Sequence, residues 1–195
     1  MTTSTALRDP RKNNLNAIVG MIYFITTETL VFAGMLYMYL SLRNNMVNWP
    51  PPGQPRLPVE VTWANTMVLL ASGVFLILAG KGFYGKSSKE KVLKHLGIGT
   101  ALGVLFLGIQ GFEWIRLIGF GLTFSGSMYG GLFYLLIGTH AVHAVTAMGF
   151  LIWAILALKA ADDMHSRQNV FIAAQMFWLF VVGVWPMLFV LVYLL

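Results

Sequence analysis

Five long apolar segments are the feature of this 195-residue sequence that most limits its fold. Each is long enough to cross a hydrocarbon core of about 30 Å as a helix, and none alternates in polarity as a membrane strand does. The sequence therefore predicts an all-α integral membrane protein, a bundle of five transmembrane helices in a single domain over residues 15–195. The predicted spans cover residues 15–42, 61–80, 96–117, 128–158 and 170–195.

The composition excludes most other classes of protein. Charged residues make up 10% of the chain and hydrophobic residues 57%, which is far from the balance of a water-soluble domain. The absence of cysteine rules out disulfides, iron–sulfur clusters and thiolate metal sites. The net charge of +6 comes from basic residues beside the spans, where orientation in the membrane and lipid headgroups explain them, so we expect no nucleic-acid partner.

The distribution of basic residues predicts the orientation. Ten lysines and arginines fall in the tail 1–14 and in the second and fourth connections, whereas the opposite side has Arg43, Arg56 and Arg116. Because positive charge marks the cytoplasmic side, we expect a cytoplasmic N-terminal tail and an external C-terminus. The first apolar segment is too long for a signal peptide and has no A-x-A cleavage pattern, so we expect it to remain as a span.

Two kinds of local sequence suggest packing features. Residues 48–58 contain five prolines, which predicts a stiff external connector; proline-rich recognition of another protein is the alternative. Gly99 and Gly103, four residues apart, and the glycines at 126, 130 and 131 favour close approach of helices. From sequence alone, these close contacts are equally compatible with packing inside the chain and with contact to a partner.

Ionisable residues at membrane depth are the candidate functional groups, because burying them there is costly. Glu28 lies about 18 Å above the inner edge of the first span, and His140 and His143 reach a similar depth from the outer side of the fourth. Since the histidines are three residues apart, they share a helix face, and Glu28 meets one of them if the two spans are neighbours. The trio is either a proton-binding or ion-coupling site or a buried polar pair that fixes helix packing. As a metal ligand set it is incomplete, and we expect no metal here.

Other polar residues suggest structural roles. Glu113 and Arg116, three residues apart near the outer end of the third span, have the spacing of an ion pair. Gln110 and Gln175 have amide groups that can bond between helices. The aromatic residues are expected to anchor spans at the interfaces or to fill gaps. We expect no catalytic residue and no cofactor ligand in this chain.

Several ordered stretches resemble subunit III of the haem-copper oxidases, the cytochrome c oxidase family. Residues 28–34, ETLVFAG, resemble the family's S-E-x-M-F-F-A-G and place Glu28 on its intramembrane glutamate. The loop sequence NWPP at 48–51 resembles that of bacterial members. Matches to N-T-x-x-L-x-x-S, Q-x-x-E-Y, Y-G-x-x-F-Y and G-F-H-G-L-H-V follow at 65–73, 110–114, 129–134 and 138–143.

Two departures from the family pattern concern the ends of the chain. The last span reads WLFVVGVW at 178–185, so Leu179 and Val182 replace the histidine and aspartate of W-H-F-V-D-V-V-W, and Pro186 follows as a potential kink. The sequence also has no counterpart of the two additional N-terminal helices of seven-span members. The resemblance is thus to the short five-helix bacterial type, and implies a lipid cleft that is reduced or completed by a neighbour.

The resemblance implies a non-catalytic accessory subunit of a respiratory oxidase in the bacterial plasma membrane. Such a subunit packs against catalytic subunit I and other oxidase subunits, binds phospholipid, and supports proton uptake and durability under turnover. Haem and copper are then expected in the partner subunits. Two alternatives remain at this point: the equivalent subunit of a quinol oxidase or nitric oxide reductase, and a stand-alone proton-coupled transporter with Glu28 as the carrier residue.

Overall fold

A computed structural model describes residues 10–85 and 87–195, with the side chains of 10–14 left out. Most of the predicted tail 1–14, including Arg8, and Lys86 of the second connection therefore lie outside the described residues. The described chain is helical, without strands, and five of its helices are long and apolar enough to cross a membrane. The prediction of a five-helix all-α membrane protein is confirmed.

The helices begin or end in polar sequence outside the apolar segments from which they were predicted. Helices α2 to α5 all extend beyond the predicted spans at one end or both, because helical hydrogen bonding continues past the last apolar residue into polar sequence. A short 3-10 turn precedes α5 and a π-helical segment follows it. The elements are α1 (Pro10–Asn44), α2 (Val59–Tyr84), α3 (Lys89–Gly119), α4 (Met128–Ala160), η1 (Met164–Arg167), α5 (Gln168–Leu188) and η2 (Phe189–Leu194).

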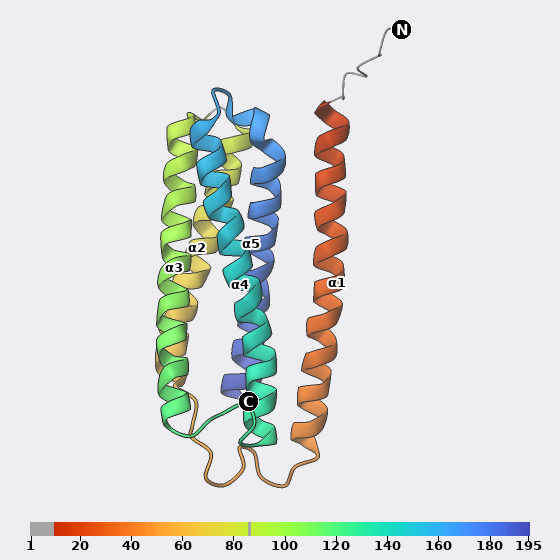
Figure 1. Cartoon of the computed structure of the whole chain (residues 1–195), viewed down its shortest axis with the longest axis vertical. Helices are drawn as coiled ribbons and strands as arrows, with labels where there is room; N and C mark the ends of the chain where they lie inside the picture. The colour runs from red at the N-terminus through yellow and green to blue at the C-terminus, as the bar shows by residue number, and fades with distance from the viewer. Residues whose placement is uncertain (1–9, 86) are drawn as a thin grey trace.

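Four of the helices form a bundle, and α1 stands at its edge (Figure 1). The closest pairs are α2 with α3 and α4 with α5, while α1 touches mainly α5 and, over a smaller area, α4. Within an apolar stretch of 18 residues in α1, only 6% of the residues are buried, against 50% for the corresponding stretch in residues 164–194, which include α5. Helix α1 is therefore attached to the bundle along one narrow line.

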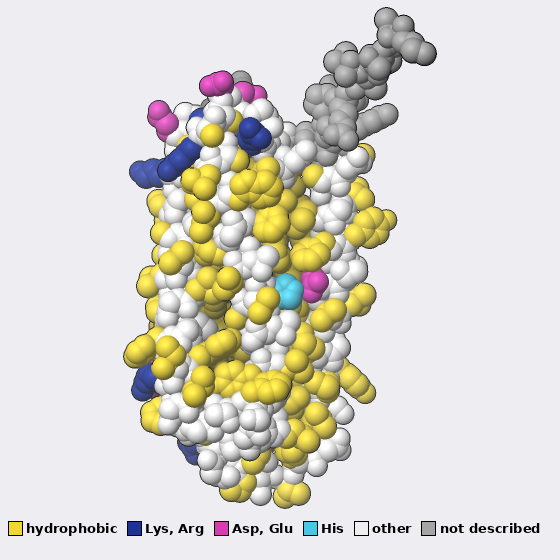
Figure 2. Space-filling model, in the orientation of Figure 1, with side chains coloured by type: hydrophobic (Ala, Val, Ile, Leu, Met, Phe, Trp, Pro, Cys, Tyr) yellow, Lys and Arg dark blue, Asp and Glu magenta, His cyan; other side chains and the backbone are white. Residues whose placement is uncertain are grey.

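The ends of the bundle carry most of the charge. The start of α1 and the α2–α3 and α4–α5 connections lie at one end, and the C-terminus lies at the other (Figure 1). Figure 2 shows acidic and basic side chains at the upper end and basic ones toward the lower end, with mostly hydrophobic side chains between them. This arrangement suits a membrane-spanning bundle, and which end faces the cytoplasm stays a prediction.

Side-chain caps help to define the helix ends. The hydroxyls of Ser88 and Ser127 accept hydrogen bonds from backbone N–H groups in the first turns of α3 and α4. At the far end of α4, Lys89 Nζ donates to the carbonyl oxygens of Lys159 and Ala161, at 3.2 and 2.6 Å. A cation at the C-terminus of a helix also opposes its dipole. Lys89 thereby ties the second connection to the fourth.

The glycines of α3 serve packing inside the chain. A Cβ on Gly99 would overlap the side chain of Leu76 on α2, and a Cβ on Gly103 would overlap Trp178 of α5 and Met148 of α4. A larger residue at either position would push helices apart. For these two glycines, the alternative of a contact to a partner is not needed.

Buried hydrogen bonds join α2, α3 and α5 at several levels. Trp178 Nε1 donates to Ser72 Oγ at 2.9 Å, and Trp185 Nε1 donates to Thr66 Oγ1 at 2.8 Å. The Asn65 amide donates to the Phe106 carbonyl at 3.1 Å. The two tryptophans were expected only to anchor spans or fill gaps.

Two glutamines also bond between helical elements, as expected. Gln110 Nε2 donates to the Tyr193 hydroxyl at 3.1 Å, and Gln175 Nε2 donates to the Leu76 carbonyl oxygen at 2.7 Å.

The last span changes its hydrogen-bond pattern after proline. Pro186 lies inside α5 and has no N–H to donate, and the chain becomes π-helical from Phe189.

The proline-rich connector contacts the bundle through Trp49. The Trp49 ring packs edge-on against Tyr39 and Tyr129, with ring centroids 5.5 and 5.1 Å apart. The connector is thus held against the bundle at one aromatic residue.

We predict that Gly103→Leu destabilises the bundle by about 1–3 kcal/mol, because the new side chain overpacks the site between α3, α4 and α5. The measurement is thermal unfolding of the purified protein in detergent. Gly108→Leu is the matched control on the same helix, since no described atom lies within 4 Å of a Cβ there. Equal melting temperatures for the two variants would contradict the packing role.

The orientation can be tested with single cysteines, because the chain has none. We predict that Asn48→Cys, in the first connection, reacts with a membrane-impermeant maleimide added to intact cells, since it faces outward. Asp162→Cys, in the α4–α5 connection, is expected to react only after lysis. Both side chains are exposed, and neither change alters the distribution of lysine and arginine. The reverse labelling pattern would overturn the predicted orientation.

Candidate functional site

Glu28 lies near the middle of α1 and faces the bundle. Its Oε2 is 2.9 Å from Nε2 of His143 on α4, and the two side chains are 22% and 15% exposed. On the other side of the ring, His143 Nδ1 is 2.8 Å from the backbone carbonyl oxygen of Thr139. The contact joins residues 115 positions apart in the sequence and links α1 to α4.

The two contacts of His143 determine how protons are arranged. A carbonyl oxygen can only accept, so Nδ1 must carry a hydrogen to bond Thr139. Nε2 then needs one more proton between it and the carboxylate, carried either by Glu28 or by the ring. In both cases the pair is neutral overall, as neutral carboxylic acid and imidazole or as carboxylate and imidazolium. The site therefore holds one proton that either group can carry.

Aromatic rings surround the pair. Phe32 of α1 lies edge-on to the His143 ring at 5.3 Å, and Phe177 and Phe180 of α5 lie at 6.2 and 6.4 Å. Figure 2 shows a histidine and an acidic side chain next to each other at mid-height, among hydrophobic side chains. Apolar surroundings strengthen the electrostatic attraction within such a pair and penalise any net charge on it.

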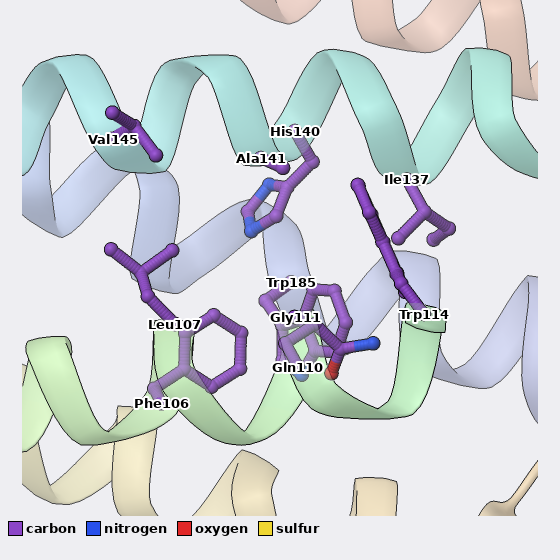
Figure 3. Close-up of a pocket in the computed structure, with 10 residues that line it drawn as sticks. All are labelled: Phe106, Leu107, Gln110, Gly111, Trp114, Ile137, His140, Ala141, Val145 and Trp185. Atoms are coloured by element: carbon purple, nitrogen blue, oxygen red, sulfur yellow. The ribbon is translucent and has the colours of Figure 1, made fainter. Parts of the chain in front are cut away.

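His140 lies apart from this pair. It is 2% exposed, its ring centroid is 5.1 Å from that of Trp185 on α5, and it lines a cavity between α3 and α4 (Figure 3). Neither of its ring nitrogens has a hydrogen-bond partner among the described residues. The structure therefore separates the predicted trio: Glu28 contacts His143, and His140 faces another part of the bundle.

The second predicted pair lies near the C-terminal end of α3. Arg116 Nη1 is 3.0 Å from Glu113 Oε1, with the carboxylate side chain 6% exposed and the guanidinium 48% exposed. A pair that is half in solvent contributes little stability, typically ~0–1 kcal/mol. Arg116 nevertheless gives the buried carboxylate of Glu113 a partner. The role of this pair stays a prediction.

No three histidine, aspartate or glutamate side chains come together as a candidate metal site within residues 10–85 and 87–195. The residues that the sequence analysis missed are the hydroxyl partners Ser72 and Thr66 of the two buried tryptophans. The available signal was chemical: an indole N–H in the interior of a membrane bundle needs an acceptor, and a hydroxyl on a neighbouring helix is the nearest kind.

Comparisons with known proteins agree with the motifs. The family model described as cytochrome c oxidase subunit III matches residues 11–195. The chain is 33% identical over 178 residues to cytochrome c oxidase subunit 3 of Synechocystis sp., which covers 90% of this chain and 74% of the relative. The same protein of Thermostichus vulcanus is 30% identical over 179 residues, 91% of this chain and 87% of the relative. That of Pelomedusa subrufa is 34% identical over 189 residues, 93% and 70% respectively. By its motifs, its five spans and these matches, the chain belongs to the cytochrome c oxidase subunit III family.

Proposed function

We propose that this chain is a non-catalytic accessory subunit III of a respiratory haem-copper oxidase in a bacterial plasma membrane. It assembles with catalytic subunit I and other oxidase subunits, binds phospholipid, and supports proton uptake during oxygen reduction. The observation that carries the proposal is the 2.9 Å contact of Glu28 with His143. It puts a proton-holding pair at membrane depth in a chain of this family.

The distribution of possible ligands supports a role without metal chemistry in this chain. The described residues offer no cluster of three imidazole or carboxylate donors, and the sequence has no cysteine. Haem and copper of the complex would then be held by the partner subunits. This chain would contribute helix packing, lipid contacts and the Glu28–His143 pair.

The pair has a structural task because α1 has few other attachments to the bundle. Half of its described large apolar side chains face outward, such as Tyr23, Leu30 and Tyr37, which are 68–76% exposed. The bond between Glu28 and His143 links α1 to α4, a helix that it otherwise touches over a small area. Loss of the bond would leave His143 Nε2 without its partner in an apolar setting, which costs about 1–3 kcal/mol.

Phospholipid is the occupant that fits the surroundings of α1. A membrane helix with only 6% of its apolar stretch buried must be covered by lipid chains or by neighbouring subunits. Lipid chains that lie along α1 would be held in place as long as α1 keeps its position. The Glu28–His143 bond would therefore control lipid binding through helix packing.

The same pair supports a role in proton uptake. Its single proton can move between the carboxylate and the imidazole without changing the net charge of the pair, and the mutual attraction of the two ions offsets part of the cost of separating charge in apolar surroundings. Both side chains retain some exposure, 22% for Glu28 and 15% for His143, which leaves the pair accessible from the surface of the described chain. We infer that the pair buffers a proton close to the oxidase interface.

We predict that Glu28→Ala and Glu28→Gln separate these two roles. Glu28→Ala removes the partner of His143, so the oxidase should inactivate about five- to tenfold faster during turnover, the effect of ~1–1.4 kcal/mol. Glu28→Gln keeps a hydrogen bond to His143 but cannot exchange the proton, so assembly should persist while proton release per electron falls. The measurements are oxygen consumption and proton release by the reconstituted complex over many turnovers.

Thr29→Val is the matched control, because Thr29 is the exposed neighbour of Glu28 and bonds only the backbone of its own helix, at Ile25. It should behave as wild type. If both Glu28 variants also show wild-type assembly, proton release and inactivation, the proposed role of the pair is wrong.

Purification provides a second prediction. In mild detergent the chain should co-migrate with a haem-containing catalytic subunit, because the proposed function requires the two to be packed against each other. The haem spectrum and the electron donor of that complex would distinguish a cytochrome c oxidase from a quinol oxidase or nitric oxide reductase. Isolation as a lone homo-oligomer without haem would instead support a proton-coupled transporter.

A further inference from the structure

A cavity of about 200 Å³ lies between α3 and α4, and neither Glu28 nor His143 lines it. Its walls are mostly apolar: aromatic rings of Phe106, Trp114 and Trp185, together with aliphatic side chains. Figure 3 shows the imidazole of His140 pointing from α4 toward α3, and the indole of Trp114 standing between the two helices. The cavity is thus an apolar space with a polar ring directed into it.

Two polar groups at this cavity lack partners. Nδ1 and Nε2 of His140, and Nε1 of Trp114, are buried without a hydrogen bond to any described residue. A neutral imidazole has one donor and one acceptor, and an indole has one donor. Leaving such groups unpaired in an apolar interior is costly, and buried polar groups almost always have a partner. The missing partner must therefore come from outside the described chain.

Water alone fits the cavity poorly. Water could pair with the nitrogens of His140 and Trp114 and with the amide of Gln110, which also lines the cavity, but it would leave the larger, apolar part of the space unfilled. For comparison, an apolar cavity of roughly 150 Å³ accommodates a benzene molecule. The size and lining therefore suit a substituted six-membered ring, and the polar groups require that this ring carries oxygen.

The cavity reaches the side of the bundle. Gly111 at its edge is exposed and has no side chain, and Val145 across from it on α4 is 61% exposed. In a membrane-spanning bundle that side faces the bilayer. His140 lies twelve residues into α4, about 18 Å along the helix, which is far from the depth of lipid ester groups. A ligand that enters here must dissolve in the middle of the bilayer.

We propose that this cavity binds the ring headgroup of a membrane-dissolved quinone. A ring oxygen accepts a hydrogen bond from Trp114 Nε1 or from the protonated nitrogen of His140, and a hydroquinone hydroxyl donates to the unprotonated nitrogen. The ring lies among the aromatic walls, and the tail leaves past Gly111 into the bilayer. The Glu28–His143 pair does not line this site, although Phe32 of α1 packs against the rings of both histidines.

The test is photolabelling of the purified complex in lipid nanodiscs with an azido-benzoquinone that carries a decyl tail. Peptide mass spectrometry should find the label on this chain, within residues 106–114 or 137–145. Gly111→Leu closes the mouth, and a Cβ there meets no described atom within 4 Å, so folding should persist. Labelling of these peptides should fall about tenfold in Gly111→Leu and about five- to tenfold in His140→Phe, which loses the hydrogen bonds.

Gly108→Leu is the matched control, since it adds the same side chain one turn away on α3 without lining the cavity. It should label as wild type does. An absence of label on these peptides, or equal labelling in Gly111→Leu and wild type, would overturn the proposal. Equal competition by decylbenzene and by decyl-benzoquinone would overturn it as well, because the site would then recognise a ring without its oxygens.

Discussion

The interior of the membrane provides no water, and the fold depends on how the chain satisfies its polar groups without it. Two indole N–H groups donate to hydroxyls of α2, and two glutamines bond across helices. The Glu28–His143 pair follows the same rule at the edge of the bundle, where a carboxylate and an imidazole satisfy each other. Each of these bonds also specifies which helices are neighbours, because none can form within a single helix. The bonds that satisfy the buried polar groups therefore also determine how the helices are arranged.

The two histidines of α4 have different surroundings, and this distinguishes two sites. His143 faces α1 and has two partners, the Glu28 carboxylate and a backbone carbonyl. His140, one turn earlier, faces α3 and α5 and has none among the described residues. The first site is complete within the chain, and its chemistry concerns one proton shared by two groups. The second site lacks hydrogen-bond partners for the His140 ring among the described residues, and a ligand that enters the cavity would supply them.

The number and type of the spans could be predicted because apolar length alone decides them. Their ends could not, since polar residues such as those around Lys89 continue a helix beyond the apolar core. Depth along two helices indicated that Glu28 would reach the level of the histidines. It could not indicate which histidine faces α1, because residues three apart differ in direction by about 60° around the helix, and the rotation of α4 is set by packing. The indole bonds were missed because pattern analysis treats tryptophan as apolar.

The bonds from Trp178 to Ser72 and from Trp185 to Thr66 have a mechanical consequence. Their spacing, six residues on α2 and seven on α5, fixes the register of two antiparallel helices at two levels. A slide of one helical turn, about 5.4 Å, would break both bonds together and leave two buried indole N–H groups unpaired, while Thr66 and Ser72 would keep their bonds to the carbonyl oxygens of Thr62 and Gly99. A piston movement of α5 against α2 is therefore strongly opposed. Helix α1 is less constrained, because little of it is buried and its described side-chain bonds to other elements are those of Glu28 to His143 and of Arg43 to the Leu195 carbonyl oxygen.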